Sequence, residues 1–454
     1  MELKQDLLAS LRATGAELFT REDNGFATAA SIVYAGDRRT PAAIIRPTTR
    51  SQLAAALPRL VAAQVSLAVR GGGHSLARHS LSDGCVVIDM RGMKHLDIDA
   101  SRRRAQAGAG LTAGEYTRAV AEYGLATGFG DSPDVGMAGL TLGGGIGYLS
   151  RRLGLTIDQL RGAEMVTLDG RIVQASADTN PELFFALRGG GGGFGVVTRL
   201  DFDLHEVSRV TGGVLAFRAD TDAILAALAA ADAAPDEISV MVNVMKAPPM
   251  PFLPEAVHGK PIIAILVCHS GDPAGAAAAL APFRAAGAAL ADTVSLMPYP
   301  QMFNESPDHT GLVPASSSFY FDTWTTSQAA TAIKAVASAD APLALINLRP
   351  MGGAIARVPP DVTAFGQRQR AVMASAVAMS PDALDVAERQ AWTRDLAAIL
   401  GDPKAGGYLS FAAQATADEV QGAFSPDSWR RLRAVKEQYD PDGVLSANFS
   451  VAAH

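Results

Sequence analysis

The sequence is poor in cysteine and contains no long uninterrupted apolar run. Only two cysteines, Cys85 and Cys268, occur among the 454 residues, and they form no CxxC pair. A disulfide framework and a zinc site are therefore excluded, and a reducing compartment is expected. The closest approach to a membrane span is the alanine-rich stretch 274–291, which Pro282 and Arg284 interrupt. Because a span needs about 20 consecutive apolar residues, we expect no contact with a membrane.

The sequence also lacks clustered positive charge. It has 39 basic against 46 acidic side chains, a formal net charge of −7, and its only tight basic run is Arg102 to Arg104. Binding of nucleic acid requires clustered lysine and arginine, so no nucleic-acid partner is expected. Charged residues interrupt the apolar positions of segment 1–23, which predicts an amphipathic helix rather than a secretory signal. These features predict a soluble cytoplasmic protein, and they leave a homodimer open.

The length allows two packed domains of about 100–200 residues each, and the texture of the sequence changes near residues 206–213. Short β-branched or alternating runs predict strands throughout the sequence. Apolar residues at helical spacing predict helices between these strands. In the second half, alanine-rich helices alternate with strands, which predicts a sheet covered on one face by helices. Predicted strands are 42–45, 65–69, 85–88, 195–202, 238–244, 262–268 and 317–324; predicted helices are 51–63, 112–123, 222–234, 274–291, 328–339 and 428–438.

Four glycine clusters lie within the first 200 residues. Glycine permits positive φ and lets backbone N–H groups come close to a ligand, so clustered glycines can form a nest for phosphate oxygens. One cluster alone would be explained as well by a turn between strands, but four together favour a shared binding site. The clusters are Arg70-Gly71-Gly72-Gly73-His74-Ser75, Gly128 to Gly136, Gly139 to Gly147, and Arg188 to Gly195.

Familiar glycine motifs do not account for these clusters. Gly190, Gly192 and Gly195 satisfy GxGxxG, but a strand-like run follows where a dinucleotide-binding Rossmann turn requires a helix. The segment 130–134 misses the GxSxG nucleophile elbow at its last residue. Since no P-loop, HExxH or EF-hand pattern occurs, neither a P-loop nor a metal site is expected.

His74 is the strongest single candidate for a residue that contacts a ligand. It follows three glycines and an apolar strand, so its imidazole can reach whatever the glycine backbone binds. A lone histidine at such a turn more often caps it through a backbone hydrogen bond. The three other glycine clusters favour the ligand-facing interpretation.

Together these motifs resemble the berberine-bridge-enzyme-like branch of FAD-linked oxidases, in the vanillyl-alcohol oxidase and p-cresol methylhydroxylase superfamily. The resemblance covers most of residues 40–206 and the tail. It implies an α+β fold with two lobes: a PCMH-type FAD-binding domain made of residues 1–206 and a returning segment 411–454, and a substrate-binding domain, 207–410, of mainly antiparallel sheet covered by helices. The motifs are RGGGHS, the run from Val135 to Gly147, Arg152-Leu153-Gly154-Leu155 with Asp158, the stretch 184–195, and Tyr439-Asp440-Pro441-Asp442 with Asn448.

The resemblance also implies a cofactor site. His74 would be joined to the 8α-methyl carbon of FAD, which makes the flavin a stronger hydride acceptor. The segment from Arg70 to Ser75 would lie along the pyrophosphate, Val197 near the adenine and Asn448 near the isoalloxazine ring. Further implied cofactor-binding positions are Ser132, Val135, Gly136, Gly139, Thr141, Gly144, Gly145 and Gly147.

Departures from the family pattern refine this expectation. Doubly linked members carry a cysteine where this chain has Ser132, and a hydroxyl is far less nucleophilic than a thiolate, so a single covalent bond through His74 is expected. Arg78 and Gly193 replace the family's usual glycine and asparagine. The family associates valine at the position of Val135 with oxygen access, which favours an oxidase, although plain packing explains this valine about as well.

On the substrate side, Tyr408 matches the family's Tyr-x-Asn-Tyr/Phe element except that Ser410 replaces the asparagine. Oxidation of an alcohol or amine needs a group that takes the hydroxyl or amine proton, so Tyr408 is a candidate base. Packing of an aromatic ring on the sheet explains it about as well. Other polar residues near the expected pocket are Glu305, His309, Asp322 and Arg357.

The sequence therefore predicts an FAD-linked oxidase. It would transfer a hydride from a small alcohol, amine or hydroxylated heterocycle to FAD and then to O2, giving hydrogen peroxide. Two alternatives remain: an FAD-binding protein that catalyses a non-oxidative or cyclisation step, and a dehydrogenase that uses another acceptor. An NAD-dependent dehydrogenase is disfavoured because the glycine pattern lacks the Rossmann context.

Overall fold

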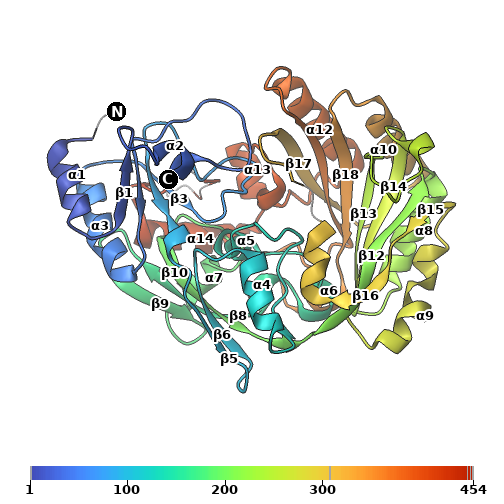
Figure 1. The fold of residues 1–454 in the computed structure, drawn as a ribbon, viewed down its shortest axis with the longest axis horizontal. Coiled ribbons are helices and arrows are strands. Elements are labelled where there is room, and N and C mark those ends of the chain that lie inside the picture. The colour runs from blue at the N-terminus through green and yellow to red at the C-terminus, as the bar shows by residue number, and fades with distance from the viewer. Residues whose placement is uncertain (1–2, 306–307, 447, 450, 452–454) are drawn as a thin grey trace.

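The chain folds into two lobes, which Figure 1 shows side by side, in a computed structural model that describes residues 3–305, 308–446, 448–449 and 451. The first lobe contains the blue to green segments, and the second contains the yellow to orange ones. The expected two-lobed α+β fold is confirmed.

A four-stranded sheet opens the first lobe, in the order β1-β2-β4-β3. β2, β4 and β3 are parallel to one another, and β1 is antiparallel to β2. Helix α3 begins after Thr49, whose hydroxyl accepts a hydrogen bond from the Gln52 N–H in a capping box. The elements are β1 (Glu17–Thr20), β2 (Ala43–Arg46), β3 (Leu67–Arg70), β4 (Val86–Asp89), α1 (Gln5–Arg12), α2 (Phe26–Ala30) and α3 (Arg50–Ala62).

A second sheet of the first lobe has five antiparallel strands in the order β5-β6-β10-β8-β9. Its strands are β5 (Leu96–Asp99), β6 (Arg104–Gly108), β8 (Leu160–Val166), β9 (Ile172–Ser176) and β10 (Val196–Asp203), and the short β7 (Leu125–Ala126) pairs with β11 (His205–Glu206). The helices here are α4 (Ala113–Ala121), α5 (Met137–Gly143), α6 (Ser150–Leu153) and α7 (Pro181–Ala186).

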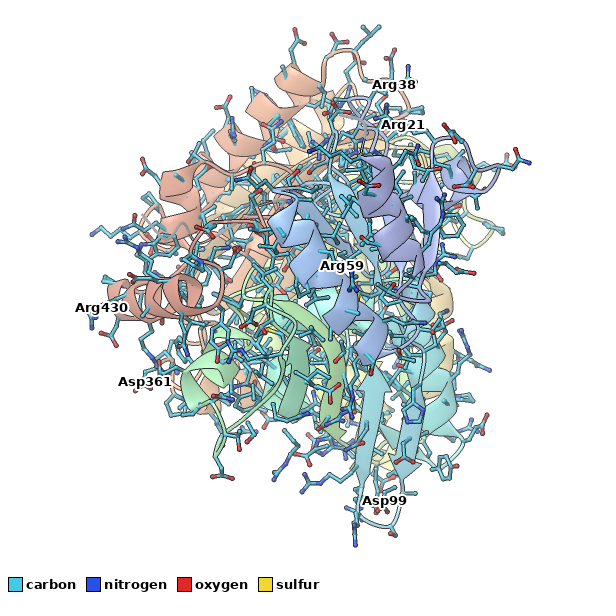
Figure 2. The ribbon with its side chains drawn as sticks, turned by 90° about the vertical axis from the view of Figure 1, so that its left-hand side faces the viewer. Arg21, Arg38, Arg59, Asp99, Asp361 and Arg430 are labelled. Atoms are coloured by element: carbon cyan, nitrogen blue, oxygen red, sulfur yellow. The ribbon has the colours of Figure 1, made fainter. Side chains whose placement is uncertain are left out.

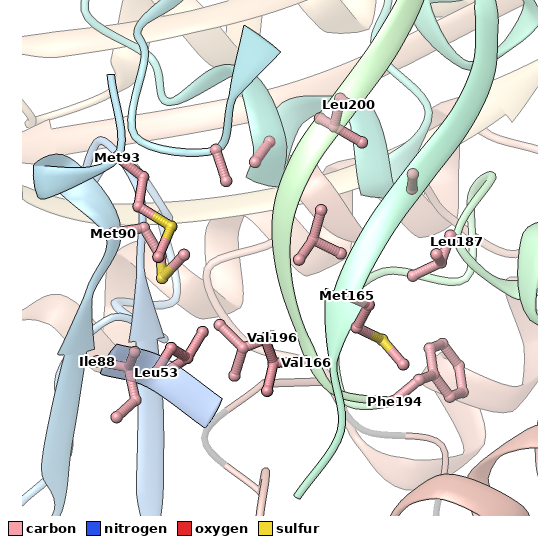
Figure 3. Close-up of a cluster of buried hydrophobic side chains, with 14 of the residues drawn as sticks. Leu53, Ile88, Met90, Met93, Met165, Val166, Leu187, Phe194, Val196 and Leu200 are labelled. Atoms are coloured by element: carbon pink, nitrogen blue, oxygen red, sulfur yellow. The ribbon is translucent and has the colours of Figure 1, made fainter. Parts of the chain in front are cut away.

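The core of the first lobe lies between these two sheets. Leu53 of α3 and Ile88 of β4 approach Val166 of β8 and Val196 of β10 (Figure 3), and all four are fully buried. Burial of each such side chain contributes about 1.5–3 kcal/mol. Apolar contact therefore holds the two sheets of this lobe together.

The second lobe is a large antiparallel sheet in the order β15-β12-β14-β13-β18-β19-β17, with β16 also paired to β12. Its strands are β12 (Arg209–Arg218), β13 (Ile238–Lys246), β14 (Pro261–His269), β15 (Ala289–Asp292), β16 (Ser295–Pro298), β17 (Val313–Phe321), β18 (Leu343–Pro350) and β19 (Val372–Ser380). The helices on it are α8 (Thr221–Asp232), α9 (Pro273–Arg284), α10 (Thr326–Ser338) and α12 (Val386–Leu400).

Side-chain alternation gives the large sheet two different faces. Val242 of β13 and Leu348 of β18 belong to a core shared with Ile224 of α8 and Val336 of α10. Successive side chains of a strand point to opposite faces. The intervening residues of β13, β18 and β19 therefore lie on the other face, which is turned toward the first lobe.

The end of the chain returns to the first lobe. Leu432 and Val435 of α14 join the core of that lobe, and Lys436 donates hydrogen bonds to the Gly193 carbonyl at 2.9 Å and to Asp440 at 2.6 Å. The remaining helices are α11 (Gly353–Arg357), α13 (Ala417–Gly422) and α14 (Pro426–Tyr439), and the 3-10 turns are η1 (Met90–Gly92), η2 (Thr156–Asp158), η3 (Glu255–Val257), η4 (Tyr299–Glu305) and η5 (Leu409–Phe411).

Buried arginines join the two lobes. Arg368, whose side chain is 0% exposed, donates to both carboxylate oxygens of Asp158 at 2.7 and 2.9 Å. Arg151 of α6 donates to the carbonyl oxygens of Met351 and Ala234. The lobes are thus connected by polar contacts as well as by packing.

Two of the predicted helices are wrong in extent. In segment 1–23, the helix ends at Arg12, and Glu17–Thr20 pairs with β2 as β1. In segment 274–291, the helix ends at Arg284, and β15 (Ala289–Asp292) pairs with β12. In both cases the hydrogen bonds offered by a neighbouring strand override the helical preference of the local sequence.

Charged side chains such as Asp99 and Arg430 point away from the ribbon toward the outside of the molecule (Figure 2). Within the described part of the chain, no helix is both long and apolar enough to cross a bilayer.

Candidate functional site

The first two glycine clusters meet backbone to backbone. A Cβ atom at Gly72 would lie 2.3 Å from the nitrogen of Gly136, and one at Gly136 would lie 2.2 Å from the nitrogen of Gly72. A distance this short is impossible for a real side chain, so both positions need glycine for the close approach. The turn after β3 therefore lies directly on the loop that leads into α5.

The other two clusters extend this contact. A Cβ at Gly147 would lie 2.4 Å from the Gly130 carbonyl oxygen, so the third cluster crosses the second. The backbone N–H groups of Gly189 and Gly191 both donate to the Leu142 carbonyl, at 3.0 and 2.9 Å, so the fourth cluster meets the third. All four clusters thus form one continuous surface of main chain around α5, between the lobes in Figure 1.

The turn after α5 is held by glycines with unusual backbone angles. Gly144 and Gly145 have φ of 128° and 77°, a range that favours glycine. A Cβ at Gly145 would also lie 2.2 Å from the hydroxyl of Thr156. The Gly145 N–H points to the second lobe, where it donates a 3.1 Å hydrogen bond to the Tyr408 hydroxyl.

His74 is half-buried at this junction, and neither of its ring nitrogens has a hydrogen-bond partner among the described residues. Burial lowers its pKa, the charges of Asp134 and Asp308 oppose that shift, and His309 adds to it. Asp134 belongs to the second glycine cluster, and Asp308 and His309 belong to the second lobe. The imidazole therefore stands neutral and unpaired where the lobes meet, and it does not cap its turn.

Arg70 has a different environment from the one expected. Its guanidinium is buried and donates to the carbonyl oxygens of Ala29 and Ser31, at the end of α2. The side chain thus ties the glycine turn to α2, which leaves the backbone of this segment to face a ligand. Ser75 is half-buried, and its carbonyl accepts a hydrogen bond from the Arg78 N–H at 2.9 Å.

Tyr408 lies in a buried aromatic corner. Its ring is edge-on to Phe411, with centroids 4.9 Å apart, and to Phe365, at 5.8 Å. Burial raises the pKa of the Tyr408 phenol, while hydrogen bonds with Ser410 and Gly145 oppose that shift. Burial thus favours the neutral phenol, and the two hydrogen bonds favour the phenolate that a base requires.

The remaining predicted cofactor-binding residues are distributed around the glycine surface. Ser132 and Val135 are half-buried in the loop before α5, and Gly139 is exposed on α5 with nothing within 4 Å of a Cβ. The Thr141 hydroxyl is satisfied by the Met137 carbonyl at 2.7 Å. Val197 lies in β10 within the core of the first lobe.

Asn448 reaches the fourth cluster from the tail. A Cβ at Gly193 would lie 3.2 Å from its side-chain nitrogen, and Gly193 has φ of 106°, which explains why glycine stands where the family usually has asparagine. The Oδ1 atom of Asn448 is buried and has no hydrogen-bond partner among the described residues.

Some residues of the site were not anticipated from the sequence. Arg349 of β18 donates to Asp131, in the second glycine cluster, at 2.5 Å and to Asn347 at 2.7 Å. Asn347 in turn donates to Asn243 of β13 at 2.6 Å. Polar residues at alternate positions of otherwise apolar strands were the signal that could have revealed them.

The weaker candidates for the substrate pocket are engaged elsewhere. Asp322 forms an ion pair with Arg370, and Arg357 forms one with Asp236. The Glu305 side chain lies outside the described residues.

These features fit FAD, the cofactor that the resemblance implies. The main-chain surface has open positions at Gly139 and Gly191, an unpaired imidazole at one end, and the orphaned Asn448 Oδ1 at the fourth cluster. Backbone N–H groups suit phosphate oxygens, and a neutral imidazole retains a lone pair for bond formation. No cluster of His, Cys, Asp and Glu among the described residues could hold a metal ion.

Comparison with known proteins agrees with this site. Residues 41–176 match the family model described as an FAD binding domain. The chain is 27% identical, over 462 residues and 98% of each chain, to (R)-6-hydroxynicotine oxidase of Paenarthrobacter nicotinovorans. It is 32% identical over 209 residues to an FAD-linked oxidoreductase of Dictyostelium discoideum, covering 45% of this chain and 46% of the other.

Solved structures show the same fold. That of 6-hydroxy-D-nicotine oxidase from Arthrobacter nicotinovorans is 25% identical, with a TM-score of 0.86, and covers 97% of this chain and 98% of its own. Berberine-bridge-enzyme-like 1 from Physcomitrella patens is 24% identical, with a TM-score of 0.85, over 96% and 97% of the two chains. The family resemblance is thereby confirmed: the chain carries an FAD-binding domain and resembles, over nearly its whole length, FAD-linked oxidases of the vanillyl-alcohol oxidase and p-cresol methylhydroxylase superfamily.

Proposed function

We propose that this enzyme is an oxidase that removes a hydride and a proton from a small organic alcohol, amine or hydroxylated heterocycle and produces hydrogen peroxide. The observation that carries the proposal is the half-buried imidazole of His74, which has no hydrogen-bond partner among the described residues and lies at the meeting point of the glycine clusters and the second lobe. When bound, FAD would accept the hydride and deliver the two electrons to O2.

Several groups of this chain would hold the cofactor. A His74 nitrogen would form a single covalent bond to the 8α carbon, and Ser132 stands where doubly linked relatives have their second attachment. Backbone N–H groups of the turn from Arg70 to Ser75 would bind the pyrophosphate, whereas those of Gly145, Gly189 and Gly191 already donate to protein oxygens. The orphaned Oδ1 of Asn448 would accept a hydrogen bond from the cofactor.

Tyr408 would take the proton from the substrate's hydroxyl or amine group. The Gly145 N–H at 3.1 Å would stabilise the phenolate form of Tyr408, which is the form that accepts this proton. Tyr408→Phe removes the reacting oxygen and keeps the ring contacts with Phe365 and Phe411. We expect kcat to fall by about 10²–10⁴-fold, while the flavin content and the melting temperature stay close to those of the wild type. Stopped-flow reduction under nitrogen measures the step, and an unchanged rate would contradict this role for Tyr408.

Covalent attachment is tested by denaturing the purified protein in acid and looking for flavin fluorescence on the protein band. We expect fluorescence on the wild-type band and none on that of His74→Ala. His95→Ala, at an exposed histidine, is the matched control and should keep the signal. Flavin that stays attached in His74→Ala, or wild-type protein without flavin, would overturn the assignment.

Substrate and acceptor are tested together. The full-length relative acts, by its name, on 6-hydroxynicotine, so hydroxylated heterocyclic amines are screened first, followed by simple alcohols and amines. Bleaching near 450 nm under nitrogen, together with peroxide release in air, is expected for an oxidase. Bleaching without peroxide would indicate a dehydrogenase with another acceptor.

The half-buried Val135, in the loop before α5, is where we expect oxygen to enter. A cytoplasmic location and a homodimer stay predictions.

A further inference from the structure

The face of the large sheet that is turned toward the first lobe carries a row of polar side chains. Asn243 of β13, Asn347 of β18 and Ser375 of β19 are cross-strand partners in register. Arg349 follows two residues after Asn347 and therefore points to the same face. Asn347, Ser375 and Arg349 are each at least nine-tenths buried. A buried polar row in an otherwise apolar sheet needs hydrogen-bond partners.

Two of the three guanidinium nitrogens of Arg349 have a hydrogen-bond partner among the described residues, and the third has none. Its Nε donates to the Asn347 side-chain oxygen at 2.7 Å, and its Nη2 donates to Asp131 at 2.5 Å. Its Nη1 is buried and has no hydrogen-bond partner within the described residues. Leaving a charged donor unpaired in the interior costs its full desolvation penalty. Such a group needs a partner, which either a buried water molecule or an atom of a bound ligand can supply.

The surroundings of the guanidinium place it within the catalytic region. Its central carbon lies 4.9 Å from the ring centroid of Phe411, whose other neighbour is Tyr408. Arg349 also lines a small cavity between the lobes together with Ile146, Gly147 and Met241. The two fixed partners hold the guanidinium in one orientation, so Nη1 is aimed by the protein rather than free to rotate.

We propose that Nη1 of Arg349 binds a hydrogen-bond-accepting oxygen of the substrate, a carbonyl or an ionised carboxyl oxygen. This inference rests on the proposed oxidase function and names a substrate class for it. Asp131 already offsets the charge of Arg349, so a neutral carbonyl is accepted as well as an anion. A substrate that lacks such an oxygen leaves the donor unpaired and is discriminated against.

The test is calorimetric binding to the purified flavin-containing protein, which requires no turnover. Benzamide and benzoate serve as neutral and charged oxygen probes of equal shape, and toluene lacks the oxygen. We expect at least one oxygen probe to bind the wild type, and Arg349→Met to weaken that binding by about tenfold or more. Arg349→Lys, which keeps a donor, should recover part of the affinity. Arg284→Met, at a partly exposed ion pair with Asp292, is the matched control and should bind as the wild type does.

The outcomes separate this subsite from the function on which it rests. Equal binding of the oxygen probes by wild type and Arg349→Met, or no binding of either oxygen probe by the wild type, overturns the subsite even when the flavin is attached and reducible. Toluene affinity that falls as much as benzamide affinity in Arg349→Met overturns it too, because the change is then one of pocket shape. A misfolded Arg349→Met is recognised by its melting curve, and the lysine variant then decides. Absence of attached flavin would refute the proposed function instead.

Discussion

Replacing Arg368 by methionine tests the polar connection between the lobes. Arg368 donates to both oxygens of Asp158 and, at 2.9 Å, to the Thr363 hydroxyl. Its removal leaves the Asp158 carboxylate, 8% exposed, with the Leu155 N–H at 2.8 Å as its remaining donor. Breaking a buried ion pair costs about 3–5 kcal/mol. Because the carboxylate keeps one hydrogen bond, we expect a loss near the lower end, about 3 kcal/mol.

The free energy of unfolding is measured by urea titration with circular dichroism. Arg284→Met breaks the partly exposed pair with Asp292 and should cost at most about 1 kcal/mol. Adding Asp158→Asn to Arg368→Met should restore part of the stability, since the unpaired charge is removed. A loss no larger than that of Arg284→Met, or a double variant less stable than Arg368→Met, would refute the reasoning.

Two further predictions follow from the site and from the histidines. Gly136→Ala places a Cβ 2.2 Å from the Gly72 nitrogen; we expect about 1–3 kcal/mol of destabilisation from overpacking and a lower flavin content, read as absorbance per protein. Gly275→Ala, which has open space in α9, should keep the flavin content and stabilise the protein by at most about 1 kcal/mol. A fully flavinylated, stable Gly136→Ala would contradict the prediction. Burial lowers the pKa of several histidines, so the unfolded chain binds more protons than the folded one as the pH falls through about 6.5. The free energy of unfolding should therefore decrease from pH 7.5 to 5.5 in urea titrations, and a flat or rising profile would rule this out. These histidines are His205, His269 and His309.

Much of the site was visible in the sequence because its chemistry is local. His74 directly after three glycines, and the clustering of glycines that permit positive φ, are features of a few consecutive residues. The role of Arg70 was less visible. Its position in the RGGGHS segment indicated the pyrophosphate, but its guanidinium binds carbonyl oxygens about forty residues earlier in the chain.

The sequence by itself determined the glycine-rich character of the first lobe, most strands and helices, and the two faces of the large sheet, because these follow from periodicity and backbone freedom within a few residues. Only the tertiary structure decided that Gly72 meets Gly136, that Arg349 pairs with Asp131, and that Ala289–Asp292 is a strand. Such pairings join segments far apart along the chain. The free energy of these contacts depends on which surfaces the whole fold brings together, so a pattern within a few consecutive residues cannot predict them.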